Sequence, residues 1–225
     1  MALVPHEFND SSGSARMRGD ERREQLIRVA INLFSHKGFS GTTTKEIAQA
    51  AGVTEALIFR HFPTKEALYE AILLWRVENS RMSDGWAKIR ELADRRDDEG
   101  LFRTVALGIL EFHRENVDFL RLMFFAKLEG HSLGEMFRQR HVQEVDDFLR
   151  DYVVTRQQEG VLRDVDPDLA VRSILGMAFF HSLETNLFRC RTTSVSDEEA
   201  VETFIRIALD GLRRPAAAEA PEEHR

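Results

Sequence analysis

The segment 43–62 contains two short helical patterns, and the residues Ala51-Gly52-Val53 separate them. Ala48 stands four residues before Gly52, and Ile58 stands six residues after it. A helix-turn-helix needs these residue types: a small residue where the helices cross, a glycine able to take positive φ at the turn, and an apolar anchor under the second helix. Such a unit places its second helix in the major groove of DNA, where side chains can hydrogen-bond to base edges.

The second helix of this unit is expected to run from an N-cap at Thr54 to Phe62. Its outward residues near the N-terminus are then Glu55, Ala56 and Leu57. The competing interpretation is an ordinary helical hairpin, because alanine and glycine are common at such turns.

Pairs of His and Glu three residues apart suggest a different chemistry. His181 and Glu184 would lie on one face of a helix, and His141 and Glu144 repeat the spacing. Metal-binding carboxylate bundles use such pairs, so a helical-bundle metalloenzyme is the alternative function. It would need two further inward carboxylates, and the remaining candidates, which lie beside loops or on other faces, are Glu111 and Glu129. We therefore expect no bound metal, no cofactor and no enzymatic activity.

Other classes of protein are excluded by composition. Cys190 is the only cysteine, which excludes an internal disulfide framework and a cysteine-rich zinc site but leaves a catalytic thiol formally open. No apolar run approaches the ~18 residues of a membrane span. The first twenty residues are polar and lack an apolar signal core, so we expect the protein to stay in the cytoplasm.

The elements that position these residues are helices. Prolines occur only at positions 5, 63, 167, 215 and 221, and no run alternates with period two for long, so the sequence predicts an all-α protein of about nine helices. Asp166-Pro167 marks one helix start. Three capping boxes mark others: Thr43 with Glu46, Ser132 with Glu135, and Ser196 with Glu199. The stretch 94–100 is expected to be a surface loop or a frayed helix end.

The charge distribution is uneven along the chain. The formal net charge is −7, but residues 16–81 carry 11 Lys or Arg against 8 Asp or Glu, a local charge of +3. The remainder carries 20 against 30, a local charge of −10. A mildly basic N-terminal part on an acidic body suits contact with phosphates by one end of the molecule.

From Arg22 to Leu73 the chain resembles the N-terminal domain of the tetracycline-repressor (TetR) family of bacterial transcription regulators. The matching positions are Gly38-Phe39, Thr42-Thr43, Ile47-Ala48, Ala51-Gly52-Val53, Phe59, His61-Phe62 and Lys65-Glu66. The resemblance implies a ligand-responsive homodimer that represses transcription, although an activator stays possible. We expect four parts: a flexible tail 1–18, a DNA-binding domain 19–66, an effector-binding and dimerisation domain 67–214, and a flexible tail 215–225. A helical adaptor without DNA binding would leave the motif from Thr43 to Lys65 unexplained.

The resemblance also implies which residues contact DNA. The expected set is Thr43, Thr44, Lys45, Thr54, Glu55, Ala56, Leu57, Phe59, His61 and Lys65. Thr43 and Thr44 begin a helix whose free amides can hold a phosphate. The three basic residues Lys45, His61 and Lys65 are candidates for phosphate contacts, and Lys45 could also reach a guanine edge. Phe59 stands where the family usually has tyrosine, so only packing against the sugar remains.

Two readings of the recognition residues stay open at this point. Glu55 could accept a hydrogen bond from a cytosine amino group, or it could cap its own helix and repel phosphate. Leu57 could touch a thymine methyl group.

For the C-terminal part, similar proteins dimerise through their last two long helices and hold a small-molecule pocket in each subunit. Here those helices correspond to about 167–190 and 197–213, and the stripe from Val201 to Leu212 would leave an apolar face for the partner. Gly176, Ala178 and Ser182 are small enough for close helix approach. The candidate effector-binding residues are Phe112, His113, Phe148, Tyr152, Phe180, His181 and Glu184. The alternative is that most of the aromatic residues are ordinary core.

Overall fold

The computed structural model describes residues 19–78, 82–130, 135, 137–190 and 195–213. The N-terminal helices are α1 (Gly19–Lys37), α2 (Thr44–Ala51), α3 (Glu55–His61) and α4 (Lys65–Glu78). The others are α5 (Met82–Asp94), α6 (Asp98–Glu115), α7 (Val117–Leu128), α9 (Gln143–Gln158), α10 (Pro167–Ser182) and α11 (Asp197–Leu212). The sequence pattern does not predict the two π-helical turns η1 (Arg138–Val142) and η2 (Leu183–Leu187). The expected all-α fold class is confirmed.

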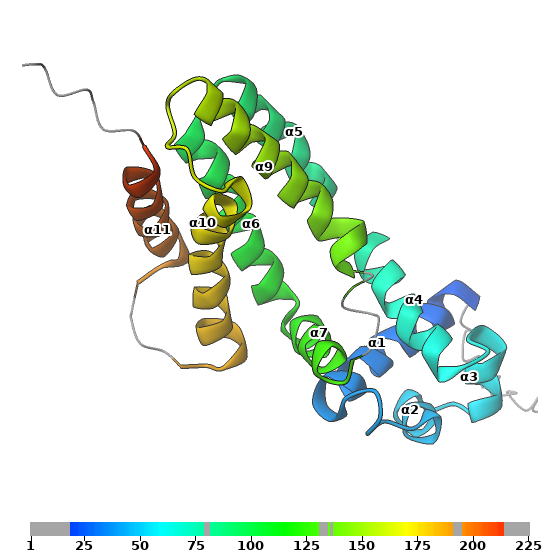
Figure 1. Ribbon diagram of the computed structural model, residues 1–225. Helices are drawn as coiled ribbons and strands as arrows, with labels where there is room; N and C mark the ends of the chain where they lie inside the picture. Colours follow the sequence, from blue (N-terminus) through cyan, green and yellow to red (C-terminus); the bar gives the residue numbers. More distant parts are fainter. Residues whose placement is uncertain (1–18, 79–81, 131–134, 136, 191–194, 214–225) are drawn as a thin grey trace, which may run out of the picture.

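The molecule is elongated, with α1 to α4 gathered at one end and α10 and α11 toward the other (Figure 1). Helix α6 runs along the molecule and packs against α5, α10 and α11, while α9 packs against α10. Helix α7 follows α6 and packs against α1. We call α1 to α3 the reading head and α5 to α11 without α7 the body.

The described residues form two hydrophobic cores. The first joins the reading head to α4, through buried residues such as Phe34, Ile58 and Ile72. Helix α7 contributes Phe119, Leu122 and Ala126 to this same core. The second core lies within the body, between α5, α6, α9, α10 and α11. The division of the chain at residues 66 and 67 remains a prediction.

Local signals position the helix ends as the sequence suggests. The side chain of Thr43 caps α2, that of Ser196 caps α11, and that of Asp166 accepts from the Leu169 amide at the start of α10. Gly38 follows α1 with φ of 72°, a left-handed conformation that glycine adopts without strain. The third expected capping box, at Ser132, lies outside the described residues, as do both expected tails.

The stretch 94–100 is more ordered than expected. Asp97 caps α6 through the Gly100 amide, and α6 begins at Asp98. Asp98 is buried. Its charge is compensated because Arg156 of α9 donates to both of its carboxylate oxygens, at 2.7 and 2.9 Å. Tyr152 donates a further hydrogen bond of 2.6 Å to the same carboxylate. The ion pair therefore draws the first turn of α6 against α9.

None of the described helices combines the length and the apolar character that crossing a membrane requires.

Candidate nucleic-acid interface

Helix α2 begins with the predicted capping box. The Thr43 hydroxyl accepts from the Glu46 amide at 3.2 Å, and the Glu46 carboxylate accepts from the Thr43 amide at 2.8 Å. Lys37 also donates to Glu46 at 2.6 Å, and this hydrogen bond is the main reason why the pKa of Glu46 falls to about 2. A carboxylate therefore already lies at the N-terminal end of α2, with Lys37 offsetting its charge.

The turn between α2 and α3 has the expected geometry. Gly52 has φ of 67°, and the amide of Val53 donates to the carbonyl of Ala48 at 2.9 Å, which closes the end of α2. The Thr54 side chain then caps α3 by accepting from the Leu57 amide. Ala48 and Ile58 are both buried. Together with the short break at the left-handed Gly52, this matches the expected helix-turn-helix.

Helix α3 presents a mixed face to solvent. Ala56 and Arg60 are exposed, and Phe59 is 44% exposed, although a phenyl ring is normally covered. Leu57 and His61 are half-buried, so they have less freedom to reach DNA than the sequence suggests. Sequence reasoning missed Arg60, because it concentrated on the first turn of this helix. A guanidinium is the side chain best suited to a guanine edge or a phosphate.

Glu55 has a partner within the helix-turn-helix. Its carboxylate accepts a hydrogen bond of 2.7 Å from the hydroxyl of Thr44, which links the first turns of α2 and α3. This hydrogen bond is neither of the two roles that the sequence suggests for Glu55. It fixes the position of α3 relative to α2. Thr44 is half-buried in this contact, whereas Thr43, Lys45 and Thr54 are exposed.

Lys65 holds the loop that leads into α2. Its ammonium donates to the carbonyls of Phe39 and Thr42, at 2.8 and 2.9 Å, and lies 4.0 Å from the centre of the Phe39 ring. An ammonium has three donors, so one is left for a phosphate. The phosphate contact of Lys65 stays a prediction. Its hydrogen bond to the carbonyl of Thr42 positions the residue that directly precedes the N-cap Thr43.

Glu129, at the end of α7, holds the same loop from the other side. Its carboxylate accepts from the amides of Phe39 and Ser40, at 3.0 and 3.4 Å. The loop from Gly38 to Thr43 is thus fixed by α4 and by α7. Any shift of α7 would act directly on the N-terminus of α2.

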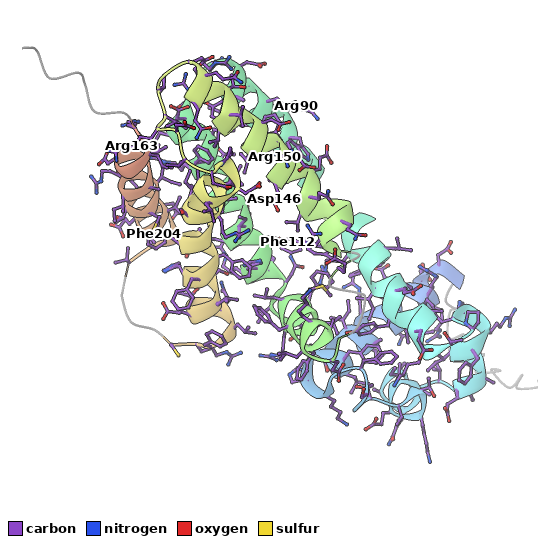
Figure 2. All side chains as sticks on the ribbon, viewed as in Figure 1. Arg90, Phe112, Asp146, Arg150, Arg163 and Phe204 are labelled. Carbon is purple, nitrogen blue, oxygen red and sulfur yellow. The ribbon has the colours of Figure 1, made fainter. Side chains whose placement is uncertain are left out.

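The residues predicted for an effector lie in separate places. Tyr152 belongs to the Asp98 ion pair, Phe148 packs edge-on against Trp86 at 5.5 Å, and Phe180 is 57% exposed. Phe112 lies toward the α7 end of α6 (Figure 2) and packs against the first core. Glu184 is half-buried on η2.

His113 and His181 are each engaged with a partner. His113 is buried, with Nδ1 2.9 Å from the Ser182 hydroxyl, and burial lowers its pKa to about 4. His181 lies 3.6 Å from Asp197 and packs against Phe204. The effector assignment of these side chains stays a prediction.

The metalloenzyme alternative finds no support in the described part of the chain, where no three His, Cys, Asp or Glu side chains converge on one point. His181 faces Asp197 of α11 instead of a second histidine. The side chain of His141 lies outside the described residues.

Among the described residues, a helix-turn-helix at one end of a helical molecule is the arrangement typical of DNA-binding transcription regulators. Residues 26–72 match the family model described as bacterial regulatory proteins, tetR family. The nucleoid occlusion factor SlmA of Vibrio cholerae is 31% identical over 164 residues, which cover 69% of this chain and 79% of that protein. The chain belongs to the tetR family of bacterial regulatory proteins.

Other relatives agree over different lengths. The HTH-type transcriptional repressor KstR2 of Rhodococcus jostii is 24% identical over 95% of this chain and 99% of its own length. The HTH-type transcriptional regulator YerO of Bacillus subtilis is 28% identical over 86% of this chain, and the chain spans 65% of its length. The structure of AibR in complex with isovaleryl coenzyme A and operator DNA has a TM-score of 0.57 at 22% identity, over 83% of this chain and 97% of AibR. The chain is therefore similar to transcription regulators over most of its length.

Proposed function

We propose that this regulator binds a palindromic operator as a homodimer and represses transcription until a small-molecule effector releases it. In this proposal residues 19–66 bind DNA, and residues 67–214 hold the effector and form the dimer. Since the target is DNA of a bacterial cell, the place of action is the cytoplasm. The relative KstR2 is a transcriptional repressor, which supports repression as the role of this chain. AibR has the same fold in complex with isovaleryl coenzyme A and operator DNA, which supports binding of both a small molecule and an operator.

The observation that carries the proposal is the exposed side of α3. Ile58 anchors the helix in the core, and the Glu55–Thr44 hydrogen bond fixes its orientation relative to α2. Ala56, Phe59 and Arg60 then remain free to enter a major groove. Exposed Thr43 and Lys45, at the N-terminus of α2, would contact the flanking phosphates.

Exposed apolar side chains on the last two helices support the dimer. Leu169, Phe180 and Ile207 are exposed on α10 and α11, and the proposed interface would cover them. Several residues that the sequence suggests for the interface are instead buried within the subunit. Val201, Ile205 and Leu209 pack into the core of their own subunit because α11 lies on α6 and α10. Ala178 and Ser182 are fully buried in the subunit as well.

Fluorescence anisotropy with labelled DNA from upstream of the protein's own gene tests the proposal. The complex should survive an excess of non-specific competitor DNA. Arg60→Gln should weaken operator binding about tenfold, as expected for loss of one charged contact. Arg90→Gln, which removes the same charge from α5 far from the reading head (Figure 2), is the matched control. A complex that competitor removes, or equal binding by Arg60→Gln and the parent, would contradict the proposed reading helix.

A second variant separates position from phosphate contact. Lys65→Ala frees the carbonyls of Phe39 and Thr42, so it should weaken operator binding through a looser α2. If Lys65 also contacts phosphate, the slope of log affinity against log salt concentration should fall by about one per contact. An unchanged slope with weaker binding would assign Lys65 to positioning alone.

A further inference from the structure

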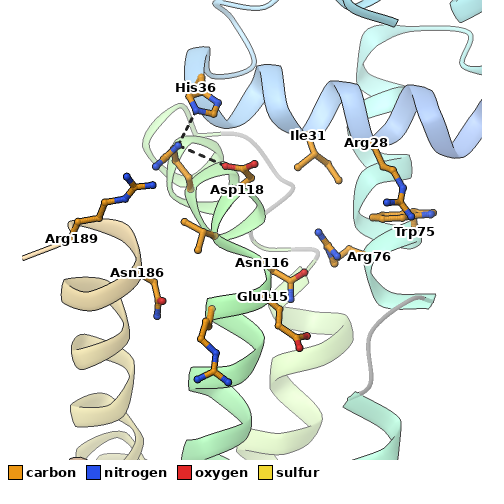
Figure 3. A pocket seen from close by; sticks show the side chains of 13 residues that line it. Arg28, Ile31, His36, Trp75, Arg76, Glu115, Asn116, Asp118, Asn186 and Arg189 are labelled. Atoms are coloured by element: carbon orange, nitrogen blue, oxygen red, sulfur yellow. Dashed lines mark hydrogen bonds and ion pairs between the residues drawn. The ribbon is translucent and has the colours of Figure 1, made fainter. Parts of the chain in front are cut away.

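A polar cleft lies where α1 and α4 face the junction of α6 with α7 and the end of η2. Its volume is about 810 Å³. In Figure 3, Arg28, Trp75 and Arg76 lie on one side of the cleft, and Asn186 and Arg189 lie on the other. None of its lining residues belongs to α3 or to the set predicted to hold an effector.

Five guanidinium groups line this arginine cleft, from five different segments: Arg28, Arg76, Arg114, Arg121 and Arg189. Only two carboxylates are among the lining residues, Glu115 and Asp118. Guanidinium groups repel one another, and their clustering is favourable only where anions offset the charge.

Carboxylates of the protein neutralise part of this charge. Arg28 pairs with Glu24 at 2.7 Å, and Arg114 pairs with Asp197 at 2.8 Å. Both pairs draw their arginine toward carboxylates that do not line the cleft.

The other three guanidiniums are less well matched. Arg121 is 3.8 Å from Asp118, too far for a hydrogen bond, and its Nη1 lies 3.2 Å from His36 Nε2. A guanidinium can only donate, so Nε2 of His36 is the acceptor in this contact. Arg189 has an exposed side chain and makes no ion pair with any described residue.

Arg76 is the third poorly matched guanidinium, and its side chain is half-buried. Its Nε is buried and has no hydrogen-bond partner among the described residues, and its guanidinium lies 5.1 Å from the Trp75 ring centre and 5.8 Å from that of Phe119. Burial lowers the pKa of Arg76 and the nearby charge of Arg28 lowers it further, while the carboxylates of Asp118 and Glu115 offset part of this effect. A negative group in the cleft would offset both effects.

We propose that the arginine cleft binds a small anion with at least two negative charges, held by Arg76, Arg121 and Arg189. Phosphate and carboxylate groups both match the planar fork of a guanidinium. One end of such a ligand would contact Arg76 of α4, and the other would contact Arg121 of α7 and Arg189, two residues beyond η2. The ligand would therefore bridge the first core and the body at a site distinct from the DNA-contacting helices.

Calorimetric titration with pyrophosphate and with citrate, at constant ionic strength and without DNA, tests this site. We expect one anion to bind per chain, with affinity above that of a sodium chloride control. Arg121→Gln and Arg189→Gln should each weaken binding about tenfold, as expected when one charged contact is lost. Arg90→Gln should bind like the parent. Circular dichroism melting of each variant verifies that the fold is kept.

Each outcome decides the proposal. Binding of pyrophosphate alone, or of citrate alone, supports the site and identifies phosphate or carboxylate as the recognised group. The absence of binding by both anions would overturn it, as would equal losses in Arg90→Gln and the two cleft variants, which would indicate non-specific attraction. Since no DNA is present, these results are independent of operator binding.

Discussion

Glu129 lies so close to Gly38 that a β-carbon on residue 38 would be 2.5 Å from the carboxylate oxygen Oε1. This is the oxygen that accepts from the Ser40 amide, while its neighbour accepts from Phe39. The approach is possible only because residue 38 has no side chain, and its φ of 72° is also one that glycine favours.

Gly38→Ala should therefore lower the free energy of unfolding for two reasons: the left-handed φ costs about 1–2 kcal/mol for alanine, and the methyl group displaces Glu129. Gly130→Ala is the matched control, because Gly130 has φ of 70° and open space around its α-carbon. Urea denaturation should show a larger loss for Gly38→Ala. Equal losses would mean that Glu129 yields without consequence. Operator affinity should fall in Gly38→Ala and hold in Gly130→Ala.

The Asp98–Arg156 ion pair predicts a large stability effect from one substitution. Asp98→Ala leaves a buried guanidinium without its bidentate partner and should lower the free energy of unfolding by about 3–5 kcal/mol. Glu99→Ala removes the neighbouring carboxylate, whose pair with Arg103 is exposed, and should change it by less than about 1 kcal/mol. Similar losses in both variants would show that the buried pair adds little.

His113 predicts a dependence of stability on pH. Its pKa of about 4 in the folded protein lies below the usual 6.5, so between these values the unfolded chain binds a proton that the folded chain does not. Stability should thus fall as pH drops below 6.5, by about 2 kcal/mol at pH 5. Denaturation of the parent and of His113→Gln at pH 7, 6 and 5 measures the difference. Parallel curves for the two proteins would contradict this role of His113.

The proposed dimer predicts that a charge at its centre separates the subunits. Ile207 is 60% exposed on α11, so Ile207→Asp should fold as a single chain but lose several kcal/mol of association free energy. Leu128→Asp is the control, because Leu128 is 83% exposed on α7. Sedimentation velocity should show monomers for Ile207→Asp only. Phe204 is a poorer probe, because it is half-buried against His181 and a charge there would destabilise the subunit itself.

The sequence predicts well what depends on neighbours along the chain. The helix-turn-helix follows from Ala48, Gly52 and Ile58, whose types and spacing suffice for a turn and two short helices. The starts of α10 and α11 follow equally from Asp166 and Ser196, because a cap bonds within its own first turn.

Contacts between distant segments leave no such signal. Glu129 is about ninety residues from the loop that it holds, and Asp98 is 58 residues from Arg156, so neither pair shows in a periodic pattern. The arginine cleft is hidden for the same reason, because each of its guanidiniums comes from a different segment. The aromatic residues that the sequence suggests for an effector site pack in separate places instead.

The place of α7 in the first core limits which parts of this regulator can move relative to one another. Phe119, Leu122 and Ala126 pack with α1 and α4, so we expect α7 and the reading head to move as one rigid unit. Helix α6 belongs to the second core, and the backbone changes direction at Asn116, whose φ of −131° and ψ of 39° are not helical. Helix α7 also contacts η2, so the junction at Asn116, eighteen residues along the chain from Asp98, and the contact with η2 both connect the first core to the body. A rotation about this junction would therefore move α3 together with α1 and α7, because all three contribute to the same core.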